Sequence, residues 1–250
     1  MTDQTATRKN TKLIIIAGLI AAVVVGLLVA KIVVENKIKA WATEDLSLYE
    51  PLLKLESAKV EASYLGSSVT YKDVVYSMPD APNIKFTIDN ISQEGIDGDT
   101  LMGKPGDVTT MDKLSMSGFR MFVEGAEQPI MEMGYYEVND MALPYRDIRT
   151  ALVANKGNPD MMGLFKAMAP IIEKSQMKSG TGSMRDFKIN MRQLEVFDMY
   201  LGEATSSGFR ELSQETDGFD AAVDDMVCKD FKITADMPDG SELLSTLESI

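Results

Sequence analysis

The sequence contains no histidine and a single cysteine, and these two scarcities remove several classes of chemistry. Without imidazole there is no Ser-His-Asp triad and no histidine-ligated zinc or iron centre. With Cys228 alone, the chain cannot form an internal disulfide. Cys228 stands in an alternating apolar pattern, which predicts a core residue rather than a nucleophile. Catalysis would have to rely on serine, lysine or carboxylate groups, and we expect a protein that is not an enzyme.

Motifs for nucleotide, acyl-transfer or metal chemistry are missing as well. The chain has no G-x-S-x-G elbow, no Walker loop and no dinucleotide fingerprint. Carboxylates gather in residues 216–225 and 97–107, but neither stretch has the order of a calcium-binding EF-hand loop. We therefore expect no metal site and no cofactor.

Positive charge is scarce beyond the first 40 residues. Residues 1–40 carry six Lys or Arg against two acidic residues, so the rest of the chain has a net charge of −17, compared with −13 overall. Such an acidic body repels nucleic acid and anionic lipid headgroups, so we expect no nucleic-acid partner.

One long apolar run is present. Residues 13–30 contain no charge, Pro, Ser or Thr, and Ile32, Val33 and Val34 extend the run past Lys31. Because roughly 20 helical residues cross a bilayer, residues 13–34 are predicted to form a transmembrane anchor. The basic tail, residues 1–12, favours a cytoplasmic N-terminus. We expect a single-pass protein of the inner (cytoplasmic) membrane, with its C-terminal domain in the periplasm.

Two further predictions concern the apolar run. Ala40-Trp41-Ala42 has the small-x-small form of a cleavage site, so a cleaved signal peptide is the alternative to an anchor. Small residues also recur at every fourth position, a spacing that lets lipid-embedded helices approach closely. This spacing predicts association with a second copy or an envelope protein partner through Gly18, Ala22, Gly26 and Ala30.

The rest of the chain is predicted to be α+β. A juxtamembrane helix over residues 35–57 precedes a β-rich periplasmic domain, residues 58–250. Period-two alternation predicts strands of a mostly antiparallel sheet around residues 84–88, 114–123, 131–135, 187–191 and 231–237. Helical spacing predicts a central helical pair near residues 145–177, with helices over 145–154 and 159–177.

Short internal echoes suggest two similar β-rich halves on either side of the helical pair. Ser117-Gly118-Phe119-Arg120 recurs as residues 207–210, and Arg185-Asp186-Phe187-Lys188-Ile189 is matched by residues 229–233.

A basic tail, one anchor and strands joined through polar turns resemble the AsmA-like and YdgA-like envelope proteins of Gram-negative bacteria. The residues that carry the resemblance are Ile88–Ile96, Lys113–Phe119 and Ser207-Gly208-Phe209. The resemblance implies an inner-membrane anchor and a periplasmic β-rich body that shields lipid or supports envelope assembly. It supplies no catalytic residue.

Methionine is concentrated beyond Ser77, where 17 of the 18 methionines lie. Thioether side chains are flexible and suit surfaces that accept varied apolar partners. They predict an apolar recess for acyl chains, lined by Met116, Met121, Met131, Met133, Met191 and Met199. A copper(I) site and an ordinary Met-rich core are the alternatives.

These patterns together predict a membrane-anchored, non-enzymatic envelope protein with membrane lipids as partners, whose β-rich domain binds lipid or another apolar ligand. The alternative is a structural or assembly subunit that binds proteins through its anchor and its acidic domain.

Overall fold

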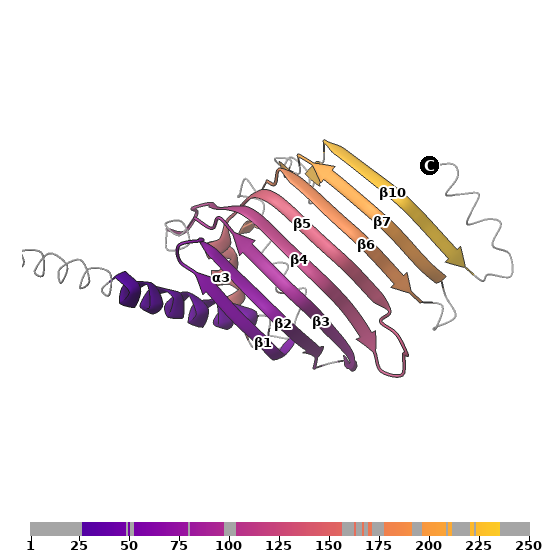
Figure 1. Ribbon diagram of the computed structural model, residues 1–250, viewed down its shortest axis with the longest axis horizontal. Helices are drawn as coiled ribbons and strands as arrows, with labels where there is room; N and C mark the ends of the chain where they lie inside the picture. Colours follow the sequence, from indigo (N-terminus) through magenta and orange to yellow (C-terminus); the bar gives the residue numbers. More distant parts are fainter. Residues whose placement is uncertain are drawn as a thin grey trace, which may run out of the picture.

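The computed structural model describes residues 27–48, 50, 53–79, 81–97, 104–156, 163, 167, 170–171, 178–191, 197–208, 210–211, 221–222 and 224–235. Its main element is one antiparallel sheet of eight strands that follow each other almost in sequence order (Figure 1). The strands are β1 (Lys54–Ser63), β2 (Ser68–Met78), β3 (Ala81–Glu94), β4 (Thr109–Val123), β5 (Met131–Leu143), β6 (Thr181–Asn190), β7 (Phe197–Ser207) and β10 (Asp225–Ala235).

The strand order is β1-β2-β3-β4-β5-β6-β7-β10, so each strand up to β7 pairs with the next strand in the chain, and β7 pairs with β10. Two short strands, β8 (Arg210–Glu211) and β9 (Ala221–Ala222), pair with each other and prolong the hairpin between β7 and β10. Only α3 (Tyr145–Ala154) and the segment after it separate β5 from β6. Such local pairing explains why alternating segments could be recognised one strand at a time.

The two faces of the sheet differ sharply in polarity. One face carries apolar side chains and contacts the helices, while the other carries charged and hydroxyl side chains. Ion pairs join neighbouring strands on this polar face, among them Lys72–Glu61, Lys113–Glu137 and Lys229–Glu203, each with 2.7 Å between nitrogen and oxygen. Antiparallel sheets commonly have one face packed on the core and the other exposed to solvent.

Residues with positive φ interrupt the alternation on every second strand. On β4, Met116 and Phe119 both lie on the apolar face because Gly118, with a φ of 66°, adds an extra step between them. At the same level, positive φ values occur at Asp73, Asp186 and Asp230. The intervening strands place Asp89, Gly134 and Gly202 beside them. We call this line the first crease.

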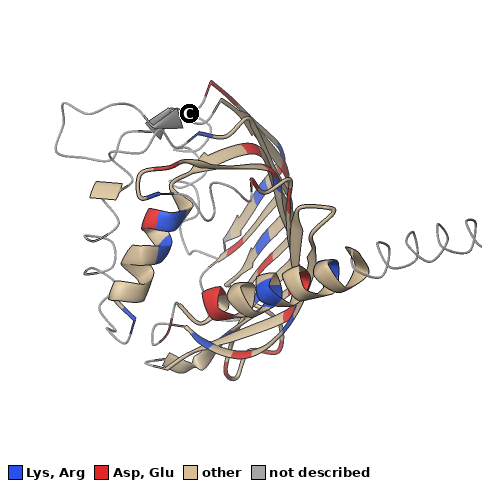
Figure 2. Ribbon diagram, turned by 90° about the vertical axis from the view of Figure 1, so that its left-hand side faces the viewer, with Lys and Arg blue, Asp and Glu red and all other residues tan. Residues whose placement is uncertain are grey.

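A second crease crosses the sheet six residues away from the first on each strand from β3 onward. Its positive φ residues are Gly95, Asp140 and Gly208, on the strands that are extended at the first crease. Because left-handed residues bend a strand, two aligned rows of them curve the whole sheet. Figure 2 shows this curvature around the two helices.

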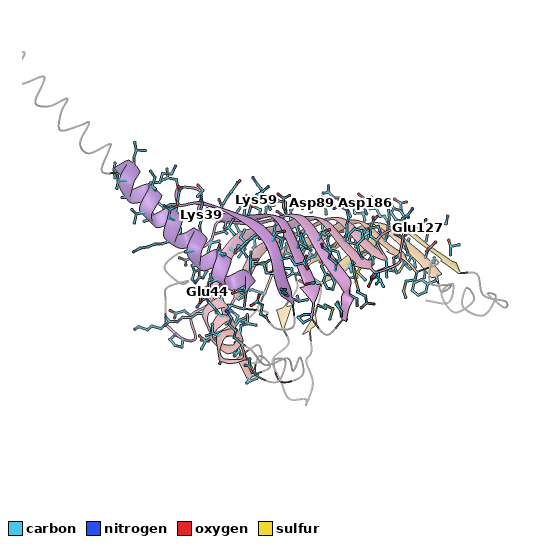
Figure 3. All side chains as sticks on the ribbon, turned by 90° about the horizontal axis from the view of Figure 1, so that it is seen from below. Lys39, Glu44, Lys59, Asp89, Glu127 and Asp186 are labelled. Carbon is cyan, nitrogen blue, oxygen red and sulfur yellow. The ribbon has the colours of Figure 1, made fainter. Side chains whose placement is uncertain are left out.

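The described helices lie on the apolar side of the sheet (Figure 3). The N-terminal helix, described over residues 27–46, places Ala42 and Leu46 against Val69, Tyr71 and Val74 of β2. Further along the chain, α3 lies beside the end of that helix. The core is therefore concentrated under the helices, at the β1–β4 side of the sheet.

The predicted α+β arrangement with a central helical pair is wrong. The structure is mostly an antiparallel eight-stranded sheet with two described helices. The first helix of the expected pair is α3, with the predicted bounds. Most of the second, residues 159–177, lies outside the described residues, so no pair is shown. Within the expected juxtamembrane helix, 35–57, the helix ends at residue 46 and β1 begins at Lys54.

The predicted location in the inner membrane is also corrected. Among the described residues, no helix combines the length and the apolar composition that crossing a bilayer requires. The described part of the N-terminal helix alternates apolar side chains with charges, and it packs one face on the sheet; its charged residues are Lys31, Glu35, Lys37, Lys39, Glu44 and Asp45. Of the predicted span 13–34, residues 13–26 lie outside the described residues, as do the tail 1–12 and the small residues Gly18, Ala22 and Gly26. Ala30 lies within the described helix and is exposed.

Candidate functional site

The apolar face is built of rows of side chains that cross the strands at right angles. Residues that pair across antiparallel strands point to the same face, so the strand register places each row on one side. One row continues without a charged residue from β2 to β10: Tyr76, Phe86, Met121, Met131, Ile189, Met199 and Ile233. A second row, across the first crease, consists of Tyr71, Ile91, Met116, Tyr136, Met184, Ala204 and Cys228.

The first crease is what keeps these two rows on the same face. Without an extra residue between them, Met131 and Tyr136 of β5 would point to opposite sides of the sheet. The crease requires a backbone with positive φ at one residue of every second strand. Gly adopts this conformation freely, and Asp adopts it more readily than most other residues. A Cβ atom on Gly118 would lie 2.0 Å from the Asp89 carboxylate, so the aspartate occupies the space above the glycine.

Burial along the apolar face falls steadily away from the helices. Val74 on β2 is fully buried and Val138 on β5 is 7% exposed, whereas Met226 and Phe231 on β10 are 67% and 53% exposed. The face therefore has a packed end beneath the helices and an accessible end at β10.

A cluster that we call the helix contact joins the N-terminal helix to α3. The Arg149 guanidinium donates to the Asp45 carboxylate at 2.8 Å and to Glu44 at 2.9 Å, and the Tyr145 hydroxyl also donates to Asp45. The Trp41 ring lies against the Tyr145 ring in a tilted arrangement, with ring centres 5.4 Å apart. Burial raises the pKa of Asp45, and the hydrogen bonds from Tyr145 and Arg149 oppose that rise. This cluster fixes the two helices together at the packed end.

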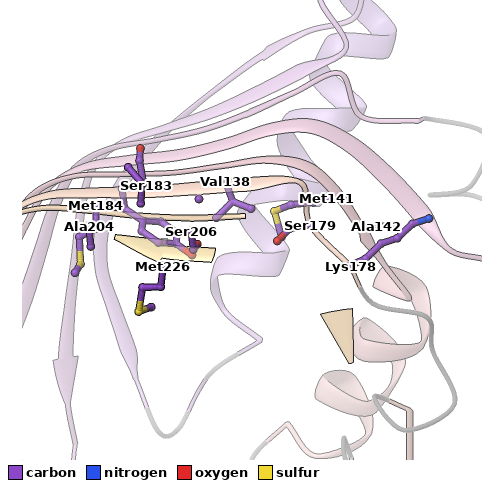
Figure 4. Close-up of a pocket in the computed structure, with 13 residues that line it drawn as sticks. Val138, Met141, Ala142, Lys178, Ser179, Ser183, Met184, Ala204, Ser206 and Met226 are labelled. Carbon is purple, nitrogen blue, oxygen red and sulfur yellow. The ribbon is translucent and has the colours of Figure 1, made fainter. Parts of the chain in front are cut away.

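Next to α3, a recess of about 330 Å³ opens on the apolar face between β5, β6, β7 and β10. Figure 4 shows Met184, Ala204 and Met226 at one end of this recess and Lys178 at the other. The remaining lining residues are Tyr136, Val138, Met141, Ala142, Ser179, Gly182, Ser183, Thr205 and Ser206. The recess is thus an apolar surface with hydroxyl groups at its margins.

The structure brings most of the predicted methionines to the apolar face but not to the recess itself. Met121, Met131 and Met199 share one row. Met116 lies in the row of Met184, and Met133 pairs with Phe119 and Phe187. Met191 lies just beyond the end of β6.

Sequence reasoning missed the methionines that line the recess, namely Met141, Met184 and Met226. Met184 and Met226 are out of phase with the predicted segments 187–191 and 231–237 because the first crease lies between, and Met141 lies beyond the second crease, outside the predicted segment 131–135. The repeated Asp-Phe-Lys-Ile and Ser-Gly-Phe-Arg segments were the available signal, since Asp186, Asp230, Gly118 and Gly208 all have positive φ.

Cys228 is exposed on β10, so its predicted place in the core is wrong. It lies at the accessible end of the apolar face, where no described helix covers it.

The polar face has a cluster of its own around Glu137 on β5. Hydrogen bonds from Lys113, Tyr135 and Asn139 lower the pKa of Glu137 to about 2. A shallow polar recess of about 340 Å³ lies beside it, on the other side of Gly182 from the apolar recess. Among the described residues, no group of three His, Cys, Asp or Glu side chains could hold a metal ion.

Comparison with known proteins does not assign the chain to a family. No protein-family model matches the chain, and neither the curated proteins nor the solved structures contain a match. The resemblance to AsmA-like and YdgA-like envelope proteins therefore stays a prediction.

Proposed function

We propose that the protein binds a lipid, or another ligand with an apolar chain, on the apolar face of its sheet, and that it carries out no reaction on this ligand. The observation that carries the proposal is the recess between β5, β6, β7 and β10, which continues the apolar rows beyond the helices. Its volume of about 330 Å³ falls within the range of small-molecule sites, roughly 300–1,000 Å³.

The composition of the recess suits a chain of variable length and shape. Met141, Met184 and Met226 can change rotamer to follow a bent or extended chain. Covering exposed apolar surface is favourable by about 25 cal/mol per Å². Met226 and Phe231 are more than half exposed, so a ligand in this region gains contact area without displacing core side chains.

The first experiment asks whether lipid accompanies the purified full-length protein. Organic extraction followed by mass spectrometry should recover fatty acyl species, and titration with a fluorescent fatty acid should show saturable uptake. The variant Ala204→Phe fills the recess from β7 and should weaken uptake at least about tenfold, because the bulky ring occupies the space of the chain.

The matched control is Lys232→Phe, which adds the same ring to the polar face of β10. Uptake should be unchanged in this variant, and circular dichroism should show both variants folded. Lack of any uptake by the folded wild-type protein, or equal uptake by the two variants, would contradict the proposal and favour the alternative of a subunit that binds proteins.

A further inference from the structure

Lys178 is the one charged residue among the described residues that line the apolar recess. We infer that the ligand is a single-chain lipid with an anionic headgroup, a carboxylate or a phosphate, and that the Lys178 ammonium binds this headgroup. The inference rests on the proposed function, because it assigns a polar partner to a ligand that the recess is proposed to hold.

The backbone of Lys178 is fixed at the margin of the recess. Its amide and carbonyl form an isolated bridge with Ala142 at the end of β5, with hydrogen bonds of 2.8 Å and 3.2 Å. The residue is exposed, and within the described part of the chain its ammonium has no carboxylate partner. Other lysines on the sheet, such as Lys113 and Lys188, are paired with glutamates instead.

The two ends of the recess differ in polarity. Figure 4 places Lys178 at one end and Met184, Ala204 and Met226 at the other, so a ligand with one polar end has a single favourable orientation. The headgroup would meet the ammonium and solvent, while the chain would lie along β6 and β7 toward the exposed edge at β10.

The size of the recess limits the number of chains. A volume of about 330 Å³ is near the lower end of the range for ligand sites, which favours one acyl chain over the two chains of a phospholipid. Because the chain beyond residue 40 is acidic, a lysine at the recess with no carboxylate partner among the described residues is a local site that an anionic headgroup would favour.

The experiment compares three probes with the same sixteen-carbon chain: hexadecanoate and hexadecyl phosphate, each below its critical micelle concentration, and hexadecanol below its solubility limit. Wild-type full-length protein should bind both anions roughly tenfold more tightly than the alcohol, because the bond to the headgroup is charge-assisted. Lys178→Gln should remove most of this preference and leave the affinity for hexadecanol unchanged. The control Lys188→Gln, on the polar face, should keep the preference.

The arms of the experiment separate the possible failures. If all three probes bind with equal affinity and Lys178→Gln changes nothing, the headgroup assignment is wrong while the apolar site stands. If no probe binds to folded protein, the proposed function itself fails. Tighter binding of hexadecyl phosphate than of hexadecanoate would identify phosphate, and the reverse order would identify a fatty acid.

Discussion

Glu137 illustrates how the polar face stabilises the sheet through single residues. Its carboxylate accepts hydrogen bonds from Lys113, Tyr135 and Asn139, which lower its pKa from 4.5 to about 2. A carboxyl whose pKa is lower in the folded state contributes stability above its unfolded pKa. That contribution is fully present above about pH 4.5 and is lost as the pH falls toward 2.

We predict that Glu137→Gln lowers the melting temperature near neutral pH and flattens its dependence on pH. The gap between wild type and variant should narrow as the pH falls below 4.5, because the wild-type carboxylate is then being protonated. Thermal unfolding across this range provides the measurement. Glu124→Gln, in an exposed turn, is the control and should follow the wild-type profile. A constant gap would show that Glu137 acts only through packing.

The crease residues give a second prediction at this scale. Gly118 and Gly125 have φ values of 66° and 87°, but a Cβ atom meets the Asp89 carboxylate at 2.0 Å only at Gly118; at Gly125 it meets nothing within 4 Å. Gly125→Ala should cost roughly 1–2 kcal/mol in the free energy of unfolding, because L residues disfavour this conformation. Gly118→Ala should cost about 2 kcal/mol more, since Asp89 and its bonds to Arg120 must move.

Urea unfolding of the two glycine variants tests this difference. Equal losses would mean that Asp89 moves aside freely and that the crease depends on backbone conformation alone. The pairing of an aspartate with a glycine on the next strand is not readable from one segment, because the partners are distant in sequence. For this reason the sequence revealed repeated motifs but not the bend that they form.

Among the elements, the N-terminal helix and α3 depend on the helix contact. Side chains of Asp45 and Arg149 are 15% and 24% exposed, so the removal of one leaves the other largely buried without its partner. We predict that Arg149→Leu lowers the free energy of unfolding by about 2–3 kcal/mol near neutral pH. Adding Asp45→Asn should recover part of this loss, as a double-mutant cycle would measure.

The pH dependence of the Arg149→Leu defect has a definite sign. Burial already raises the pKa of Asp45, and the loss of Arg149 removes a group that opposes the rise. When the folded pKa lies above the unfolded value, protonation favours folding, so the defect should shrink as the solution is acidified. A defect that grows in acid would show that Asp45 is ionised and otherwise satisfied in the variant.

Elements with strong local patterns were predictable from the sequence. The bounds predicted for α3, Tyr145–Ala154, match the structure, and the alternating segments of β3, β4, β5, β6 and β10 were recognised as strands. The strands β1, β2 and β7 were missed. The pairing between β1 and β2 contains register shifts, and the alternation of apolar and polar residues is broken at Asp73 in β2 and at Gly202 in β7. Hydropathy alone does not reveal that Ala42 and Leu46, which follow the apolar run, pack on a sheet.

On the scale of the whole molecule, the packed and accessible ends of the apolar face differ in burial. Helices cover the β1–β4 side, and there the core holds the fold together. The β5–β10 side is apolar but accessible, which is the property expected of a surface that a ligand covers. The sequence indicated a Met-rich face but could not locate its accessible end, because that depends on where the helices dock.

The last prediction follows from this asymmetry and compares truncation to alanine at the two ends of the apolar face. Val74 is fully buried beneath the N-terminal helix, and Met226, on the apolar face of β10, is 67% exposed. Val74→Ala should cost about 2 kcal/mol, from the lost burial of two methyl groups and the cavity left behind. Met226→Ala should change the free energy of unfolding by less than about 0.5 kcal/mol. Denaturant titration with circular dichroism provides both values, and similar losses would mean that the β10 end is packed as tightly as the helix-covered end, leaving no accessible apolar surface for a lipid.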